Sequence, residues 1–151
     1  SEDQVATDSY ATAISNWMQH IREGKKPFLN GDGHNRRDMV HVNDVVSANV
    51  FAMEFDGLFS GSVCDVGTGE NISLNEIIQI IKKHFPKIEF ERRPPRQGDV
   101  LLTKAKISNL KKLGWQAQIK IKQGIGKCFA DLKHYKSGKG RSRMRNNNGV
   151  M

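Results

Sequence analysis

The chain has 151 residues, of which 37% are hydrophobic, and it carries a formal net charge of +8. This is enough length and apolar material for one domain, and no stretch approaches the roughly 20 apolar residues that a membrane span needs. The N-terminus has neither the basic start nor the apolar middle of a secretory signal, so we expect a cytoplasmic protein with no membrane contact. Cys64 and Cys128 lie in apolar runs without metal-ligand or disulfide spacing, which predicts two buried thiols.

The positive charge is concentrated at the C-terminus. Residues 133–151 contain no acid and carry six of the eight net positive charges, which leaves +2 for residues 1–132. The same segment is rich in Gly, Ser and Asn, so burial cannot offset the entropy lost on ordering. We therefore expect a folded lobe over 1–132 and a basic, disordered tail over 133–151. A contact between this tail and nucleic acid is the alternative to a solvated extension.

The chain begins with a predicted helix and turn. Apolar residues at positions 10, 13, 14, 17, 18 and 21 follow the helical period and stop at Gly24, which predicts an amphipathic helix. Trp17 lies on its core stripe, so we expect it to pack in the core rather than to stack on a sugar. Residues 27–30 predict a short extended piece, and the glycines of 31–33 predict a turn.

A strand and a helix are expected next. Residues 37–42 predict a strand, and Asn43 or Asp44 is the candidate N-cap of the following helix, with a helix-capping carboxylate as the simplest role of Asp44. A second strand is predicted over 62–66. The expected core face of the helix between these strands comprises Val45, Val46, Ala52 and Met53.

The second half predicts three further helices. Ser73 and Glu76 have the spacing of a capping box, and Pro86 ends the helix that they begin. Residues 88–91 predict a third strand, and Gly114 closes a short helix. The buried positions expected in these helices are Leu74, Ile77, Ile78, Ile81, Phe85, Leu110, Leu113, Ile121, Ile125, Cys128, Phe129 and Leu132.

Strands that alternate with helices imply the α/β class. Three short strands are too few for a free-standing doubly wound sheet beside about five helices. We therefore expect a small mixed lobe that packs on a larger sheet.

Two polar stretches, 30–44 and 92–100, hold the candidate binding residues. Each offers an arginine, whose planar guanidinium makes paired hydrogen bonds to phosphate oxygens. Gly98 allows a tight turn that would bring Asp99 beside Arg96, where a carboxylate is suited to accept hydrogen bonds from ribose hydroxyls. The residues alone leave a simpler alternative, in which surface arginines pair with Asp32 or Asp38.

The order of the motifs is more specific than any single motif. A helix is followed by P-F-L-N-G-D-G-x-x-x-R-D-M-V-H-V-N-D-V, C-D-V-G-T-G-E-N-I-S-L-N-E-I, P-x-R-x-G-D-V and K-L-G-W. From about Tyr10 to about Leu132 this series resembles the extended short-chain dehydrogenase/reductase family of NAD-dependent nucleotide-sugar epimerases and dehydratases. The resemblance implies the C-terminal, substrate-binding part of that fold without most of its Rossmann half. P-x-R-x-G-D-V favours relatives of UDP-glucose 4-epimerase.

The resemblance also implies site residues. Arg37 would contact the diphosphate, Arg96 would grip it from the opposite side, and Asp99 would bind the ribose. The nucleobase site would be lined, partly through backbone groups, by Phe28, Leu29 and Asn30.

The family's reaction is hydride transfer to bound NAD, with a Tyr-x-x-x-Lys pair whose lysine lowers the tyrosine pKa so that it acts as a base. Only Tyr135 and Lys139 have that spacing here, and their place in the tail, after the last expected helix, makes the match accidental. The pair Gly67 and Gly69 lacks the third glycine of a dinucleotide fingerprint, since Ile72 stands there, so it is interpreted as a structural turn. We therefore expect no catalytic residue and no NAD bound by this chain alone.

The predicted function is to bind the nucleoside diphosphate of a UDP- or dTDP-sugar as the C-terminal portion of an NAD-dependent epimerase or dehydratase, without catalysis by this portion alone. The expected partners are the nucleotide sugar and either a cofactor-binding half or a second copy of the chain. No metal site is expected. The alternatives are a catalytically silent interaction protein and a basic nucleic-acid-binding protein that uses the tail with Arg92, Arg93 and Arg96.

Overall fold

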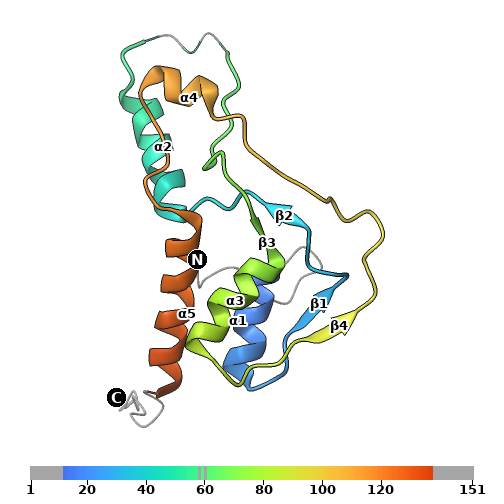
Figure 1. The fold of residues 1–151 in the computed structure, drawn as a ribbon. Coiled ribbons are helices and arrows are strands. Elements are labelled where there is room, and N and C mark those ends of the chain that lie inside the picture. Colours follow the sequence, from blue (N-terminus) through green and yellow to red (C-terminus); the bar gives the residue numbers. More distant parts are fainter. Residues whose placement is uncertain (1–11, 58, 60, 138–151) are drawn as a thin grey trace, which may run out of the picture.

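The structure is a computed structural model that describes residues 12–57, 59 and 61–137. These residues form five helices and four short strands, which confirms the predicted small mixed α/β lobe. The elements are α1 (Ala13–Glu23), β1 (Phe28–Asn30), β2 (Arg36–Arg37), α2 (Val42–Glu54), β3 (Ile72–Ser73), α3 (Leu74–His84), β4 (Glu91–Arg93), α4 (Ser108–Leu113) and α5 (Ile121–Ser137). Figure 1 shows α1, α3 and α5 gathered beside β1 and β4, with α2 and α4 at the N-terminal end of α5. No described helix is long and apolar enough to cross a membrane.

Two short ladders join segments that lie far apart in the sequence. Strand β1 pairs in parallel with β4, so that Phe28 lies opposite Glu91. Strand β2 pairs with β3 in the antiparallel sense, with Arg36 opposite Ser73. Parallel strands need a long connection, and here residues 31–90 supply it.

A third contact extends the first ladder. The amide of Arg36 donates to the carbonyl of Leu101 at 2.8 Å, and the amide of Thr103 donates to the carbonyl of Arg36 at 3.0 Å. The amide of Asp38 donates to the carbonyl of Thr103 at 3.2 Å. Residues 28–38 therefore lie beside residues 91–103, which places the two predicted polar stretches together.

The predicted strands are mostly wrong. Of residues 37–42, only Arg37 is in a strand, because α2 already begins at Val42. The strand predicted at 88–91 is displaced to β4. Residues 62–66 form no strand, and among the described residues no backbone amide of 63–66 donates to another backbone carbonyl. A strand requires a hydrogen-bonded neighbour, which the local residue pattern does not reveal.

Helix α1 confirms its prediction. The Thr12 hydroxyl accepts a hydrogen bond from the amide of Ser15 at 3.3 Å, and Gly24 ends the helix in the left-handed conformation with φ of 75°. The predicted apolar stripe is buried at Trp17, Met18 and Ile21 and half-buried at Ala13 and Ile14, whereas Tyr10 lies outside the described residues.

Helix α3 begins with the predicted capping box. The amide of Glu76 donates to the Ser73 hydroxyl, and the amide of Ser73 donates to the Glu76 carboxylate, both at 3.1 Å. The hydrogen bond from the Ser73 amide is the main cause that lowers the pKa of Glu76 to about 2. Glu76 therefore stays ionised above this pH and holds Arg36 at 3.0 Å and Lys122 at 3.3 Å.

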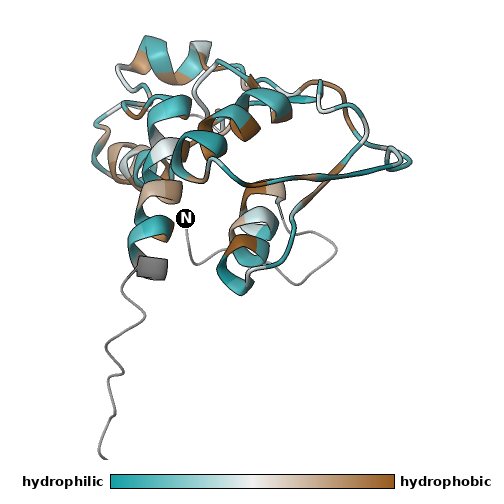
Figure 2. Cartoon of the chain, turned by 60° about the horizontal axis from the view of Figure 1, so that its bottom comes forward, coloured by the Kyte–Doolittle hydropathy of each residue, from teal (hydrophilic) through white to brown (hydrophobic). Residues whose placement is uncertain are grey.

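The main core lies between α1, α3, α5 and β1. In Figure 2, apolar and polar residues alternate along the helices. This pattern is typical of helices with one buried face. A smaller cluster joins α2 to α4 and the segment after it through Ala48, Leu110 and Trp115. The largest fully buried side chains of the main core are Trp17, Leu29, Ile72, Ile77, Ile81 and Phe129.

The start of α2 differs from the prediction. His41 is the N-cap instead of Asn43 or Asp44, because its ring Nδ1 accepts a hydrogen bond from the amide of Asn43 at 3.2 Å. The buried carboxylate of Asp44 accepts hydrogen bonds from the amides of Gln118 and Ile119, each at 3.0 Å. Asp44 is therefore structural, but it ties the chain before α5 to α2 instead of capping its own helix.

The predicted core face of α2 is also wrong. Of its four residues only Val45 is half-buried; Ala52 is exposed, and Val46 and Met53 are 56% and 85% exposed, whereas Ala48 and Asp44 are buried. The helix instead carries an exposed apolar row, the α2 stripe, formed by Val42, Val46, Val50 and Met53. Its spacing of four, four and three residues is that of one helical face. Such a face normally packs against another element.

The last elements extend the prediction. Helix α4 ends at Gly114 as expected. Helix α5 continues to Ser137, so the boundary predicted between 132 and 133 lies inside it, and Tyr135 is in the helix instead of after it. Residues 138–151, with Lys139, lie outside the described residues, so the disorder of the tail stays a prediction. Cys64 and Cys128 are half-buried and form no disulfide with each other.

Candidate functional site

All six predicted binding residues line one cavity of about 380 Å³. It lies between α1, β1, the end of β2 and the turn over 96–99. The pairing of 28–38 with 91–103 brings its two sides together. Its walls are Thr12, Ala13, Asn16, Trp17, Phe28, Leu29, Asn30, Arg37, Asp38, Met39, Leu74, Arg96 and Asp99. That these residues bind a nucleotide stays a prediction.

One end of the cavity is built on β1. The indole Nε1 of Trp17 donates to the carbonyl of Phe28 at 2.6 Å, which fixes the strand against α1. The guanidinium carbon of Arg93 lies 3.8 Å from the centre of the Phe28 ring, and the His20 ring meets the same ring edge-on. Leu29 is 2% exposed, so its side chain belongs mainly to the core. The Phe28 ring is therefore held in place before any ligand binds.

The other end carries the charged side chains. Arg37 Nη2 lies 2.7 Å from Asp99 Oδ1, and Arg37 Nη1 donates to the carbonyl of Arg36 at 3.0 Å. Arg36 itself points elsewhere, to Asn71 and Glu76. The adjacent arginines of β2 thus have separate roles, since side chains alternate along a strand.

The turn over 96–99 forms as predicted, but its carboxylate has a different partner. Gly98 has φ of 77°, and the amide of Asp99 donates to the carbonyl of Arg96 at 3.2 Å. The carboxylate of Asp99 turns to Arg37 instead of Arg96. Arg96 is exposed, and its guanidinium has no hydrogen-bond or ion-pair partner in the described part of the chain.

Asp38, which lines the cavity, joins the turn at 67–69 to the segment at Ala105 through its carboxylate. Its carboxylate accepts hydrogen bonds from the amide and hydroxyl of Thr68 at 3.0 and 2.6 Å. It also accepts from the amides of Gly69 at 2.9 Å and Ala105 at 3.1 Å. The simpler alternative, in which Asp38 pairs with a surface arginine, is therefore wrong. Asp32 likewise accepts a backbone amide, that of His34 at 2.9 Å.

The Gly-Thr-Gly turn is shaped by its packing. A Cβ at Gly67 would lie 2.3 Å from the Cβ of Ala105, and one at Gly69 would lie 2.5 Å from Cδ1 of Ile107. Phosphate sites on glycine-rich turns need free backbone amides. The amides of Thr68 and Gly69 already donate to Asp38, so the turn does not fit the pyrophosphate of NAD.

Comparisons with known proteins agree with this arrangement. A sequence profile of the NAD dependent epimerase/dehydratase family matches residues 2–67. UDP-glucose 4-epimerase of Mycolicibacterium smegmatis is 34% identical over 121 residues, which are 78% of this chain and 37% of that protein. dTDP-L-rhamnose 4-epimerase of Burkholderia thailandensis is 33% identical over 127 residues, 82% of this chain and 34% of that protein.

The chain belongs to the NAD-dependent epimerase/dehydratase family. Among solved structures, UDP-glucose 4-epimerase of Thermotoga maritima with UDP-glucose superposes with a TM-score of 0.74 and 27% identity. UDP-N-acetylglucosamine 4-epimerase of Methanobrevibacter ruminantium in complex with UDP-N-acetylmuramic acid gives the same TM-score at 26% identity. Each match covers 89% of this chain and 42% of the other. The epimerase/dehydratase fold is thus confirmed for a chain that spans about two fifths of its relatives.

In this chain of the epimerase/dehydratase family, sequence reasoning missed one residue that contacts the lining of the candidate cavity, and part of the role of another. Asn35 donates from Nδ2 to Asp99 Oδ2 at 2.6 Å, across 64 positions of sequence. Nothing local distinguishes Asn35 from its polar neighbours. Trp17 was expected in the core and lies there, but it also holds the Phe28 carbonyl. A buried indole requires an acceptor, which is the signal that predicts such a bond.

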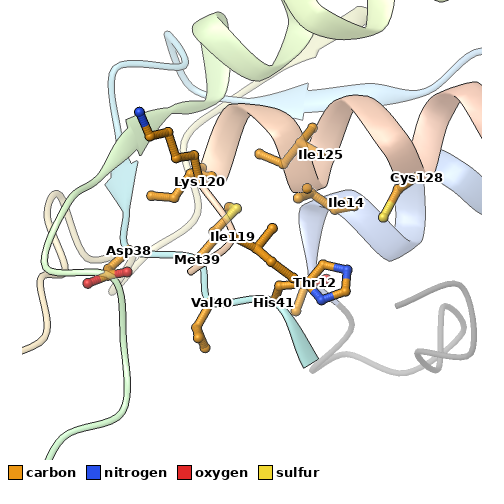
Figure 3. Close-up of a pocket in the computed structure, with 12 residues that line it drawn as sticks. Thr12, Ile14, Asp38, Met39, Val40, His41, Ile119, Lys120, Ile125 and Cys128 are labelled. Atoms are coloured by element: carbon orange, nitrogen blue, oxygen red, sulfur yellow. The ribbon is translucent and has the colours of Figure 1, made fainter. Parts of the chain in front are cut away.

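A second cavity of about 260 Å³ adjoins the first, since both are lined by Thr12, Asp38 and Met39. Figure 3 shows Ile14, Ile125 and Cys128 gathered on one side of it, with the Asp38 carboxylate apart from them. Its lining holds no pair of arginines. The first cavity is therefore the better candidate for an anionic ligand in this epimerase/dehydratase chain.

Proposed function

We propose that the cavity beside β1 binds the nucleoside diphosphate of a UDP- or dTDP-sugar, and that the chain is the C-terminal portion of an NAD-dependent epimerase or dehydratase. The observation that carries the proposal is the convergence of an aromatic ring, two guanidinium groups and a carboxylate on one cavity from two distant segments. Phe28 with Asn30 would receive the base, Arg37 and Arg96 the diphosphate, and Asp99 the ribose.

The charged side chains of the cavity favour binding of a small anionic group such as a diphosphate. Arg37 is partly neutralised by Asp99, whereas Arg96 at the rim has no described partner. A diphosphate accepts paired hydrogen bonds from guanidinium groups, so it satisfies Arg96 and competes with Asp99 for Arg37.

The same contacts weigh against nucleic acid. Arg92 donates to the carbonyl of Asp32 at 3.0 Å, and Arg93 makes two 2.9 Å hydrogen bonds to Glu91. Two of the three arginines assigned to that alternative are therefore engaged within the fold. Nucleic-acid-binding proteins neutralise many phosphates with free cations, and of these three arginines only Arg96 has no partner in the described part of the chain.

The test is calorimetric titration of the chain with UDP at a low and a high salt concentration, with a short single-stranded DNA in parallel. We expect one saturable UDP site with moderate salt dependence. Arg37→Ala and Arg96→Ala should each weaken UDP by about 2 kcal/mol, because each removes charge-assisted hydrogen bonds. Arg37→Ala also leaves the Asp99 carboxylate without its cationic partner beside the diphosphate, so its loss should be the larger.

Lys104→Ala is the matched control, since it removes one exposed cation outside the cavity. It should leave UDP affinity nearly unchanged. UDP binding that is unaffected by both arginine changes refutes the assigned roles. DNA binding that collapses at high salt, without any UDP binding, would favour the nucleic-acid alternative.

The reaction requires a second half. In the family, NAD supplies hydride chemistry, and the residues of this chain bind and orient the substrate. We propose that the α2 stripe packs on that cofactor-binding half, because four apolar residues of one helical face lie exposed while the opposite side of α2 is covered at Ala48. The cytoplasmic location stays a prediction.

Without that half, the α2 stripe should drive self-association. We expect the sedimentation coefficient of the chain to rise with concentration, and the double variant Val46→Lys/Met53→Lys to abolish the rise. The control Ala52→Lys/Gln116→Lys adds the same charge at exposed positions outside the stripe and should not abolish it. A chain that stays monomeric at every concentration contradicts the role of the stripe.

A further inference from the structure

We propose that Asn35 is a positioning residue that holds Asp99 for the ribose, and that the site thereby prefers a ribonucleoside diphosphate to its 2′-deoxy form. The inference rests on the proposed nucleotide function and narrows the class of ligand.

The carboxylate of Asp99 is held at both oxygens. Arg37 donates to Oδ1 at 2.7 Å, and Asn35 donates to Oδ2 at 2.6 Å. An ionised carboxylate has about four lone-pair sites, so each oxygen keeps room for a further donor. Two neighbouring acceptors at a fixed orientation match the adjacent 2′- and 3′-hydroxyls of a ribose.

The two donors respond differently to a diphosphate. Arg37 is charged, so phosphate oxygens compete with Asp99 for its guanidinium. Asn35 is neutral, and its backbone carbonyl accepts a hydrogen bond from the backbone amide of Leu74 at 3.2 Å, at the start of α3. Asn35 therefore stays hydrogen-bonded to Asp99 when Arg37 binds the phosphate oxygens of the ligand.

The hydrogen bond from Asn35 matters because the turn that carries Asp99 lies at the surface. The Asp99 side chain is 31% exposed, and Gly98 beside it adopts a left-handed conformation on an open surface. Once Arg37 is drawn to phosphate, Asn35 is the only described side chain that still donates to this carboxylate. Loss of the Asn35 side chain should therefore remove the preference for ribose over 2′-deoxyribose, while the contacts of Phe28 and Arg96 with the nucleotide remain.

The experiment compares UDP with 2′-deoxy-UDP, which differ by one hydroxyl. The wild-type chain should prefer UDP by about tenfold, the effect of one hydrogen bond to a charged group. In Asn35→Ala the preference should fall to within about twofold, with the affinity for 2′-deoxy-UDP nearly unchanged. Asn35→Asp, which keeps the side-chain size and repels Asp99, should lose the preference as well.

Asn75→Ala is the matched control. Asn75 also anchors this loop, by donating to the carbonyl of Asp32 at 2.9 Å, but it does not line the cavity. It should retain the preference for UDP. Thermal unfolding followed by circular dichroism shows that each variant is folded at the titration temperature.

The outcomes separate the two proposals. Failure of the wild-type chain to bind either nucleotide refutes the nucleotide site itself. Equal affinity of the wild-type chain for both ligands leaves that site standing and overturns the role of Asp99 and Asn35 in reading the ribose. An unchanged preference in folded Asn35 variants, or an equal loss of affinity for both ligands, also overturns the positioning role.

Discussion

Replacement of Asp38 by alanine should lower the free energy of unfolding by about 3 to 4 kcal/mol, a large part of the 5 to 15 kcal/mol typical of a domain. The carboxylate accepts three backbone amides and one hydroxyl, from the Gly-Thr-Gly turn and from Ala105. Its removal leaves these donors without an acceptor in a half-buried place, where each unsatisfied group costs about 1 to 3 kcal/mol and water restores only part of that.

Urea unfolding measures this loss, and an unchanged slope with denaturant shows that the unfolded state is the same. Asp65→Ala is the control, because Asp65 accepts one backbone amide, that of Lys106 at 3.0 Å, at an exposed position. It should cost about 1 kcal/mol or less. If Asp38→Ala costs no more than the control, the carboxylate does not organise the turn. Asp38→Asn should fall between the two, since an amide keeps one acceptor oxygen.

Replacement of Gly33 by alanine should destabilise the lobe by about 3 kcal/mol, from left-handed strain of about 1 to 2 kcal/mol and overpacking of about 1 to 3 kcal/mol. Gly33 has φ of 80°, and a Cβ there would lie 2.4 Å from Asn75 Oδ1 and 2.9 Å from Leu29 Cδ2. Neither neighbour can move freely, because Asn75 is hydrogen-bonded to the carbonyl of Asp32 and Leu29 is in the core.

Gly24→Ala separates the two contributions. Gly24 has nearly the same φ, 75°, but a Cβ there would meet nothing within 4 Å. This control should show the conformational strain alone, about 1 to 2 kcal/mol. Thermal or urea unfolding of the two variants gives the difference, and equal losses would contradict the close packing around Gly33.

Local patterns predicted the helices well and the sheets poorly. The capping box of Ser73 and Glu76 and the end of α1 at Gly24 depend on residues within one or two turns, and both are confirmed. Residues 62–66 have the composition of a strand but no partner among the described residues. The apolar residues of α2 predicted a buried face, yet burial depends on what lies against the helix, and α2 is largely uncovered.

The site was predictable residue by residue but not in its internal bonds. The motif resemblance identified Arg37, Arg96 and Asp99, and the structure places all three on one cavity. The local residue pattern placed Asp99 beside Arg96 because they are close in sequence, whereas the carboxylate binds Arg37 and Asn35. Contacts across more than 60 residues depend on the register of β1 with β4, which no local pattern encodes.

The pairing of 28–38 with 91–103 also sets the order in which the cavity can be made. During synthesis on the ribosome, β1 and Arg37 emerge first. The residues of α2, β3, α3 and β4 must then be added before Arg96 and Asp99 emerge. Closure of so long a loop comes late in folding. In the proposed function, a nucleotide therefore could not assist folding of the early part of the lobe during synthesis, and its binding would require a chain that has already been translated through Thr103.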